Sequence, residues 1–312
     1  MSQIKVSIVI PVFNEEKNIQ LIYDKIVLLP CFKETDSFEI IYVNDGSIDN
    51  SNIVLRALAK NDNKVKIISF SKNFGHQAAL TAGIEFSTGK AVITMDCDLQ
   101  DPPDVIPEMI DKWEKGAEIV YMRRNTRKDK FFKRFTARLY YKILKKFTDL
   151  KIYGDIGDFR LLDRIVVNEL LKLNEKTRYL RGMVAWLGFN YSIVDYDRPK
   201  RIHGKTSFSF LKMSRLGMSG ILNFSLLPLR FGLILGLITI FTGVFFIGYI
   251  TVDSLCFDKI YPLYKWLSVI TFIFVGLLFI LIWILGEYVG RTYDETKQRP
   301  LFIVRDKINF KE

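Results

Sequence analysis

Two aspartates one residue apart are the strongest candidates for chemistry in this chain. Asp96 and Asp98 directly follow residues 91–95, an apolar and β-prone stretch that predicts a buried strand. Carboxylates at the carboxyl end of such a strand suit hard cations such as Mg²⁺ and Mn²⁺, which usually share their coordination shell with substrate phosphates. The pattern therefore favours a metal–nucleotide site. The alternative is a pair of turn-forming acids, because an Asp-x-Asp pattern is common by chance.

Composition limits the classes of protein that remain. The 312 residues suffice for one large or two modest domains, and 49% of them are hydrophobic, with the excess in two stretches near the C-terminus. The three cysteines have no Cys-x-x-Cys spacing, which argues against a disulfide scaffold and against structural zinc. Residues 1–12 have a strand pattern, so no cleaved signal peptide is expected. The net charge is +11, and residues 122–151 hold twelve lysines and arginines against two aspartates, which indicates an anionic partner or a membrane surface.

Strand-like and helix-like stretches alternate through the first third of the chain. The expected strands are residues 5–11, 38–43, 65–70, 91–95 and 117–122, and the helices between them lie near 19–29, 51–59, 77–86 and 105–115. This alternation predicts an α/β fold with a mostly parallel sheet in three layers. Ligands bind such sheets at the carboxyl ends of the strands, where acidic loops occur three times, at 14–15, 45–46 and 96–98. Neither a Walker phosphate loop nor a Gly-x-Gly-x-x-Gly motif is present, which argues against P-loop ATPases and dinucleotide enzymes.

Four motifs in order make a family resemblance specific. They are residues 9–16 (VIPVFNEE), 43–49 (VNDGSID), 73–83 (NFGHQAALTAG) and 95–103 (MDCDLQDPP). Together they resemble the inverting family-2 glycosyltransferases with the GT-A (Rossmann-like) fold. More narrowly, they resemble polyprenyl-phosphate glycosyltransferases such as bactoprenol glucosyltransferases and dolichol-phosphate mannose synthases. The resemblance continues through residues 157–161 and the apolar C-terminal stretches, so it spans nearly the whole chain.

The resemblance implies a donor site built from the acidic loops. The residues that would hold the base and ribose of a nucleotide sugar are Pro11, Phe13, Glu15 and Asp45, with Asp96 in the same site. The ligands implied for Mg²⁺ or Mn²⁺ are Asp96, Asp98 and Gln100. A divalent cation neutralises the charge that develops on a leaving diphosphate, which fits a sugar-nucleotide donor. On the residues alone, Asp45 also fits a plain Asp-Gly turn and Gln100 a solvated turn amide.

The phosphate contacts that the resemblance implies are Arg123, Arg134 and Arg201. A guanidinium group makes two-pronged hydrogen bonds to phosphate oxygens, which suits that role. Over residues 130–147 the aromatic side chains recur at helical spacing, so we expect them to be buried and expect no nucleic-acid partner. For Arg134 the alternative is a solvated basic face that touches anionic lipid.

Asp158 is the candidate general base. It stands in the sequence Gly-Asp-Phe, which resembles the family's aspartate near the attacking oxygen, and an inverting transfer needs a base or an anchoring carboxylate there. A phosphate acceptor is already ionised, so Asp158 can instead orient the acceptor. Asp155 is a weaker candidate because it reads as a loop acid. We expect His76 to be a hydrogen-bonding residue at the start of a helix and assign it no catalytic role.

The C-terminal third predicts a membrane anchor. We expect a catalytic domain over residues 1–208, an interfacial amphipathic helix over 209–229, two transmembrane helices within 230–288 (about 230–252 and 263–288), and a tail over 289–312. Lysines and arginines flank the pair of apolar stretches on both sides, while the link between them carries few. The positive-inside rule then predicts a multi-pass protein of the plasma (inner) membrane, with the catalytic domain and both termini in the cytoplasm.

The sequence thus predicts a metal-dependent inverting glycosyltransferase. The resemblance implies transfer of a hexose, with glucose from UDP-glucose preferred, to undecaprenyl phosphate at the cytoplasmic face of the membrane. Other donors within the family are UDP-N-acetylglucosamine, GDP-mannose or a modified arabinose. An inactive membrane-tethered scaffold is the alternative from another class, and the intact acids argue against it. A processive polysaccharide synthase would need more membrane spans and a Gln-x-x-Arg-Trp motif. The sequence lacks that motif, which argues against this class of enzyme. A homotetramer is expected by the same resemblance.

Overall fold

The computed structural model describes residues 5–33, 37–124, 156–176, 178–197, 199 and 262–310, together with residues 241, 242, 245 and 252. The chain divides into two compact units. The first comprises Met1–Gly217 and Arg299–Glu312 and carries the sheet, while the second comprises Met218–Gln298 and carries the helix α11 (Leu263–Thr296). The predicted interfacial helix over 209–229 lies outside the described residues, as does most of the first predicted transmembrane stretch.

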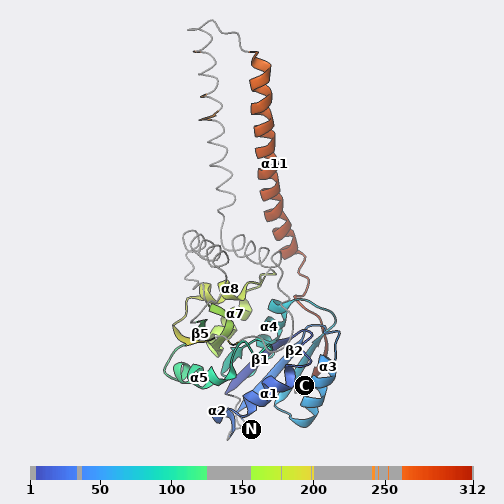
Figure 1. The fold of residues 1–312 in the computed structure, drawn as a ribbon, viewed down its shortest axis with the longest axis vertical. Coiled ribbons are helices and arrows are strands. Elements are labelled where there is room, and N and C mark those ends of the chain that lie inside the picture. The colour runs from blue at the N-terminus through green and yellow to red at the C-terminus, as the bar shows by residue number, and fades with distance from the viewer. Residues whose placement is uncertain are drawn as a thin grey trace. The chain divides into compact units, whose positions relative to one another are not determined.

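The first unit, whose central strands β1 and β2 are labelled in Figure 1, is built on a mixed sheet. This sheet has eight strands in the order β7-β5-β6-β4-β1-β2-β3-β8. Its strands are β1 (Val6–Val12), β2 (Phe38–Asn44), β3 (Val65–Phe70), β4 (Ala91–Thr94), β5 (Ile119–Arg124), β6 (Ile156–Asp163), β7 (Tyr191–Tyr196) and β8 (Val304–Ile308). Every residue of β1, β2 and β4 is buried, as expected for central strands of a parallel sheet that is covered on both faces. Strands β6 and β8 pair antiparallel with their neighbours, so the sheet is mixed but mostly parallel.

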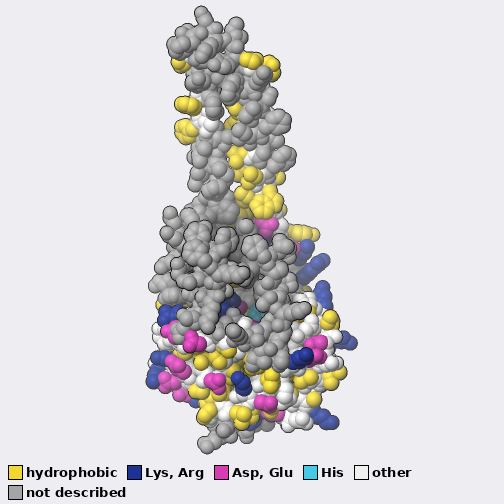
Figure 2. All heavy atoms as spheres, viewed as in Figure 1, with side chains coloured by type: hydrophobic (Ala, Val, Ile, Leu, Met, Phe, Trp, Pro, Cys, Tyr) yellow, Lys and Arg dark blue, Asp and Glu magenta, His cyan; other side chains and the backbone are white. Residues whose placement is uncertain are grey.

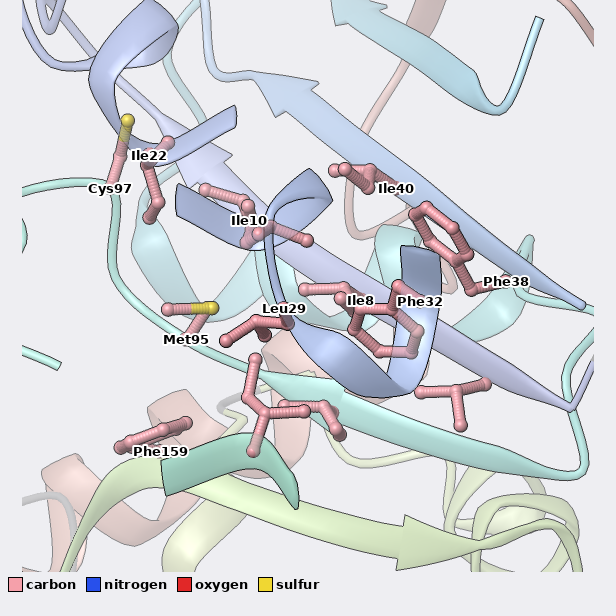
Figure 3. Close-up of a cluster of buried hydrophobic side chains, with 14 of the residues drawn as sticks. Ile8, Ile10, Ile22, Leu29, Phe32, Phe38, Ile40, Met95, Cys97 and Phe159 are labelled. Carbon is pink, nitrogen blue, oxygen red and sulfur yellow. The ribbon is translucent and has the colours of Figure 1, made fainter. Parts of the chain in front are cut away.

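Helices cover both faces of this sheet. They are α1 (Ile19–Val27), α2 (Pro30–Lys33), α3 (Ser51–Asn61), α4 (His76–Glu85), η1 (Pro103–Val105), α5 (Ile106–Glu114), α7 (Arg164–Lys172) and α8 (Leu180–Leu187). On one face, side chains of α1, α3 and α5 join the core around Ile8 and Ile10. Figure 3 shows part of this core, with Ile22 of α1 near Ile10. On the other face α4, α7 and α8 line a small space over β4 and β6. Helix α4 packs so closely that a Cβ on Gly83 would lie 2.2 Å from Cγ1 of Val9, which requires glycine there. The three-layer α/β arrangement expected from the sequence is therefore present.

The strand β8 completes the sheet beside β3 and comes from the segment that the sequence analysis treats as a tail. The Phe302 ring stacks on Phe70 with their centroids 5.0 Å apart, and the Ser71 amide donates to the Ile303 carbonyl at 3.0 Å. The Asn309 side-chain amide donates to the carbonyls of two residues of the first unit at 2.7 and 2.8 Å. The alternating polar sequence of β8 gives little hydrophobic signal, which is why sequence reasoning missed it.

The mixture of charges on the first unit differs from the strongly basic average of the chain. Acidic and basic side chains are interspersed on the face of the unit shown in Figure 2. Much of the excess positive charge belongs to residues 125–151, which lie outside the described residues. The described surface on that face therefore shows no field of a single sign.

Membrane location was predicted from the two apolar C-terminal stretches, and the structure overturns that prediction. Within the ranges described above, no helix combines the length and the hydropathy needed to cross a membrane. The prediction of a multi-pass membrane protein with cytoplasmic termini is therefore wrong.

The buried carboxylate of Glu39 on β2 should contribute to the stability of the sheet. Its carboxylate accepts hydrogen bonds from Ser7 Oγ at 2.5 Å and from the Thr88 amide at 2.7 Å, and it pairs with Lys66. We expect Glu39→Ala to lower the free energy of unfolding by about 3 kcal/mol, because it leaves the mostly buried Lys66 ammonium without its partner. Denaturant unfolding at pH 7 measures this loss.

The pH dependence of unfolding provides a second measurement, and the variant Glu114→Ala provides the control. Burial raises the pKa of Glu39, but the contacts with Lys66, Ser7 and Thr88 lower it by more than burial raises it. The pKa in the folded state therefore lies below the ordinary 4.5. The stabilisation is therefore present above about pH 4.5 and is lost as the pH falls through the folded pKa. Glu39→Ala should lack this component, while Glu114→Ala, which removes an exposed ion pair with Lys5, should cost less than about 1 kcal/mol. Equal losses in the two variants would contradict the prediction.

Candidate active site

The loops at the carboxyl ends of β1 and β2 are tied together by hydrogen bonds. The Asn14 amide donates to Ser47 Oγ at 3.1 Å, and the Asn14 side-chain oxygen accepts from the Ile48 amide at 2.9 Å. The Glu15 amide donates to Ser51 Oγ at 3.0 Å. Asn14 has φ +57°, a left-handed conformation that asparagine tolerates better than most residues. The first two acidic loops of the sequence analysis therefore converge on one edge of the sheet.

The residues predicted to hold the base and ribose occupy different environments in this edge. Pro11 is buried within β1, whereas the ring of Phe13 is 40% exposed just beyond the strand. The Glu15 carboxylate accepts from the Asn18 side chain at 2.5 Å. The contact of Phe13 with a nucleotide base stays a prediction.

Asp45 is buried and fixes the loop that leads into α4. Its carboxylate accepts hydrogen bonds from the Phe74 amide at 2.7 Å, from the Gly75 amide at 3.0 Å and from the Asn73 side chain at 2.9 Å. Burial raises the pKa of Asp45 above its ordinary value, although the two backbone amides act in the opposite direction. The structural role of Asp45 is thus plain, and its contact with a nucleotide stays a prediction.

The segment from Asp96 to Asp101 is held in a strained conformation by its own acids. Asp98 is buried and accepts from the Gln100 amide at 3.0 Å, and Asp101 is buried and accepts from the Asp96 amide at 3.2 Å. Leu99 between them has φ +60°, which costs about 1–2 kcal/mol for a residue with a Cβ. The side chain of Asp96 remains about one-third exposed. The strained loop therefore presents one carboxylate outward, a form of strain that often marks a functional site.

The oxygen atoms of Asp96, Asp98 and Gln100 fit a hard cation only if a substrate supplies further ligands. The described residues contain no group of three or more His, Cys, Asp or Glu side chains that would hold a metal ion. Asp96 and Asp98 do provide carboxylate oxygens on one loop, followed by the amide of Gln100. Mg²⁺ sites commonly use one or two carboxylates and take their remaining ligands from water and substrate phosphates. The residues present are compatible with that kind of site.

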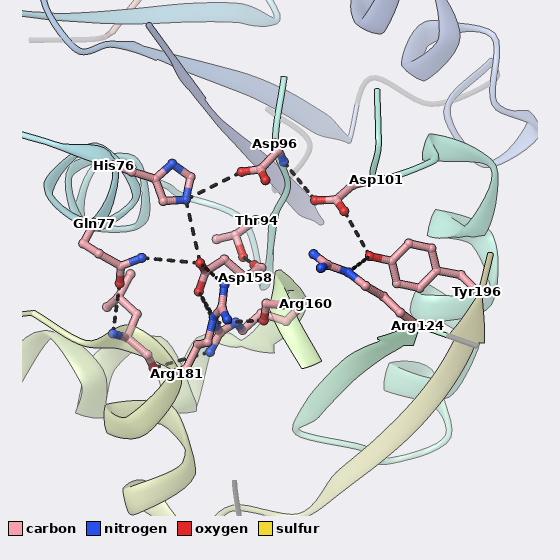
Figure 4. A network of polar contacts seen from close by, with 12 residues as sticks. His76, Gln77, Thr94, Asp96, Asp101, Arg124, Asp158, Arg160, Arg181 and Tyr196 are labelled. Carbon is pink, nitrogen blue, oxygen red and sulfur yellow. Dashed lines mark hydrogen bonds and ion pairs between the residues drawn. The ribbon is translucent and has the colours of Figure 1, made fainter. Parts of the chain in front are cut away.

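Asp158 on β6 lies at the centre of a polar cluster (Figure 4). Its Oδ1 accepts from Arg160 Nη2 at 2.7 Å and from Arg181 Nε at 3.1 Å. Its Oδ2 accepts from Arg181 Nη2 at 2.9 Å and from Gln77 Nε2 at 3.4 Å. The Thr94 hydroxyl donates to the Asp158 main-chain carbonyl at 2.5 Å, so the end of β4 holds this residue as well.

His76, the first residue of α4, lies between the two acidic centres. Its Nε2 is 3.6 Å from Asp96 Oδ1 and 3.8 Å from Asp158 Oδ2. The next residue, Gln77, accepts a hydrogen bond from the Leu180 amide at 3.1 Å and so connects α4 to the start of α8. The position of His76 at a helix start agrees with the sequence analysis, but its place between two carboxylates could not be read from the sequence.

Two adjacent arginines at the end of β5 have separate partners. Arg123 makes a two-pronged ion pair with Asp195 of β7, at 2.6 and 2.8 Å, on the exposed surface. Arg124 donates from Nε to the Tyr196 hydroxyl at 3.1 Å, and its guanidinium points toward the space between Tyr196 and Asp158 in Figure 4. Arg123 is exposed, whereas Arg124 is partly buried. The geometry favours Arg124, although the resemblance suggested Arg123.

Tyr196 connects Arg124 to the acidic loop. Its hydroxyl donates to Asp101 Oδ1 at 3.1 Å while it accepts from Arg124. Burial, together with the charge of Asp101, raises the pKa of Tyr196 to about 12. The hydroxyl therefore stays protonated at neutral pH and fixes the Asp101 carboxylate. The other two predicted phosphate contacts, Arg134 and Arg201, and the weaker candidate Asp155 lie outside the described residues.

The family is decided by sequence. Residues 7–171, more than half of the chain, match the family described as glycosyl transferase family 2. The chain belongs to glycosyl transferase family 2. It is a glycosyltransferase, and its mixed sheet is of the GT-A-like α/β type that the sequence predicted.

Relatives of this glycosyltransferase are similar over nearly their full length. YkcC, a glycosyltransferase of Bacillus subtilis, is 43% identical over 304 residues, which cover 97% of this chain and 94% of that protein. The prophage bactoprenol glucosyl transferase homolog of Escherichia coli is 40% identical over 304 residues, or 96% of this chain and 98% of that protein. Among solved structures, glucosyl-3-phosphoglycerate synthase of Mycobacterium tuberculosis matches at 19% identity and a TM-score of 0.45, over 69% of this chain and 76% of that one.

Sequence reasoning missed several residues that contact Asp158 or Tyr196 in the candidate site. These are Gln77, Arg124, Arg160 and Arg181. Gln77 and Arg160 lie inside motifs used for the resemblance, but their contacts depend on segments that are far apart in the chain. Arg181 follows Asp158 by 23 residues and reaches it from a different element. The one available signal was Arg160, which stands two residues after Asp158 in an otherwise apolar stretch. A charged side chain in such a stretch needs a partner, because an unpaired buried charge is costly.

Proposed function

We propose that this glycosyltransferase moves a hexose, glucose from UDP-glucose, onto a polyprenyl phosphate, with undecaprenyl phosphate as the natural acceptor. The observation that carries the proposal is the 40% identity to the bactoprenol glucosyl transferase homolog, which extends over 98% of that protein. A relationship of this extent includes the donor loops and the Asp158 segment as well as the C-terminal third. The resemblance of the four donor-site motifs to the polyprenyl-phosphate enzymes supports the same acceptor class.

The residues of the carboxyl edge have distinct proposed parts in this transfer. Phe13, with the loops that Glu15 and Asp45 stabilise, would contact the nucleoside. Asp96 and Asp98, with Gln100 beside them, would hold Mg²⁺ or Mn²⁺, which when bound neutralises the charge on a leaving diphosphate. Arg124 would donate hydrogen bonds to phosphate oxygens from the other side of the site.

The proposed reaction is a direct displacement. An ionised oxygen of the acceptor phosphate attacks C1 of the sugar, and the bond from C1 to the donor diphosphate breaks. The electron pair leaves with the nucleoside diphosphate, and the configuration at C1 inverts. The protein supplies orientation and electrostatic stabilisation, which usually account for most of the rate enhancement in such transfers.

A transfer assay tests the proposal. Purified protein is incubated with undecaprenyl phosphate and a panel of labelled donors, namely UDP-glucose, UDP-N-acetylglucosamine, GDP-mannose and a nucleotide-linked arabinose derivative. We expect label in the lipid fraction with UDP-glucose, at least about 100-fold less with EDTA, and recovery on adding Mg²⁺ or Mn²⁺. Transfer from another donor would change the assigned sugar. Failure of every donor to label the lipid phosphate would overturn the proposal and favour the inactive scaffold.

A further inference from the structure

We infer that Asp158 is an anchor for the Arg181 guanidinium rather than the base of the reaction, and that Arg181 is a positioning residue of the site. This inference deepens the proposed function and rests on it, because it concerns a phosphate acceptor. It goes beyond the family resemblance, which left a base and an orienting carboxylate as alternatives. Three steps support it: the contacts of the carboxylate, the charges around it, and the proton balance of the reaction.

The contacts leave no oxygen of Asp158 unoccupied by protein. Three side chains from three elements supply four hydrogen bonds, two to each oxygen, at distances of 2.7 to 3.4 Å. Arg181 contributes two of these and meets the carboxylate edge to edge, the geometry in which a guanidinium is held most firmly. A general base needs a free lone pair within about 2.6–3.2 Å of the proton that it removes. The oxygens of Asp158 instead serve the two arginines.

The surrounding charges favour the carboxylate form. Burial raises the pKa of Asp158, but Arg181 and Arg160 lower it more, and His76 acts in the same direction, so the pKa lies well below its ordinary value. These are the charged groups that face Asp158 from α8, β6 and α4. A carboxylate with so low a pKa is a weak proton acceptor at neutral pH. Asp158 and its two arginines together carry a net charge of +1, which favours an anionic acceptor nearby.

The proton balance of the proposed reaction needs no base. The attacking oxygen of a phosphate monoester is ionised above its second pKa of about 6, so the new bond to C1 forms without release of a proton. A sugar hydroxyl acceptor would release one proton, and that proton would require a competent base. The oxygens of Asp158 already accept hydrogen bonds and are weakly basic. Asp158 therefore suits an acceptor that is already ionised and has no proton to give up.

The first test uses the unmodified enzyme and two acceptors. The pH dependence of kcat/KM is measured with a polyprenyl phosphate and with the matching phosphonate, whose second ionisation occurs at higher pH. If the acceptor alone carries the essential negative charge, the acidic limb should move to higher pH with the phosphonate. An acidic limb at the same pH for both acceptors would assign it to a protein group and would overturn the inference.

The second test compares Arg181→Met, Asp158→Asn and the double variant at pH 7.5. As parts of one unit, the single variants should each lose about 10- to 100-fold in kcat, and the double variant should lose no more than the worse single one. The loss in Arg181→Met should fall on the acceptor alone: kcat/KM for the lipid phosphate drops, while the Kd for UDP and the acidic limb stay as in the unmodified enzyme. A merely structural Arg181 would weaken UDP binding as well. Arg56→Met, which removes an exposed arginine from its pair with Asp306, is the matched control and should keep full activity.

The outcomes separate the inference from the proposed function. Absence of transfer by the unmodified enzyme to any lipid phosphate would remove the proposed function itself. Normal transfer, together with an Asp158→Asn loss at least 10 times larger than that of Arg181→Met, would retain the function and overturn the anchor. Should Asp158→Asn fail to fold, the acceptor comparison and the partly exposed Arg181 position still decide the question.

Discussion

Replacing Asp96 by alanine should lower the rate of sugar transfer by at least about 10³-fold, equivalent to about 4 kcal/mol of transition-state stabilisation. The expectation rests on where the carboxylate lies. Asp96 is the member of the acid pair whose side chain is partly exposed at the carboxyl edge, while the strained turn at Leu99 and the buried Asp101 hold its backbone. Loss of its oxygen would remove a ligand from the site that we propose for Mg²⁺ or Mn²⁺. Initial rates of lipid labelling at saturating donor measure the effect.

A second measurement separates metal binding from general damage to the site. Mn²⁺ binding in the presence of UDP, followed by electron paramagnetic resonance, should weaken in Asp96→Ala in parallel with activity. Asp104→Ala removes an exposed acid eight residues further along the chain and should leave both measurements unchanged. Normal Mn²⁺ binding in an inactive Asp96→Ala enzyme would contradict the assignment of Asp96 as a ligand.

Replacing Arg124 by methionine should reduce kcat by about 10²- to 10³-fold, the usual cost of losing one preorganised donor to a developing negative charge. Burial acts to lower the pKa of Arg124, but Tyr196 and Asp101 raise it, and the net direction is upward, so this group stays cationic at any working pH. Its hydrogen bond to Tyr196 fixes it on the side of the site opposite His76 and Gln77 (Figure 4). We expect the loss mainly in kcat, because the charge on the diphosphate increases as the bond to C1 breaks.

Arg123→Met is the informative comparison, since it removes the same side chain one position earlier. Its ion pair with Asp195 is exposed and should contribute little to stability. We expect its activity to fall less than about fivefold, well within the effect of an exposed charge. A larger loss in Arg123→Met than in Arg124→Met would restore Arg123 as the phosphate contact.

The pattern of strands and acidic loops could be predicted because it depends on short-range sequence. The buried strands β1, β2 and β4 are continuous apolar stretches, and the acids that follow β4 stand at the end of such a stretch. Once the sheet is parallel, its topology brings the loops that follow its strands to one edge. The hydrogen bond from the Asn14 amide to Ser47 Oγ shows this for the loops after β1 and β2. The alternation alone was therefore enough to predict the three-layer α/β class.

The details that the sequence could not supply depend on partners that are distant along the chain. Arg123 and Arg124 have the same chemistry, and they differ in their partners on β7, Asp195 and Tyr196, which are far away in the sequence. The state of Asp158 is set by Arg181, 23 residues away on another element, so no local pattern distinguishes an anchor from a base. The membrane prediction used hydropathy of the C-terminal stretches alone, and the described helices did not support it.

The last strand of the sheet has a consequence for how the chain is made. Strand β3 ends at Phe70, but the partner for its outer edge, β8, begins at Val304. Ribosomes add about 5–20 residues per second, so the interval between the two strands corresponds to roughly 10–50 s of synthesis. During that time the edge of β3 has unpaired amides and carbonyls that can pair with other extended chains. We therefore expect nascent copies of this protein to need a chaperone or rapid completion to avoid aggregation on the ribosome.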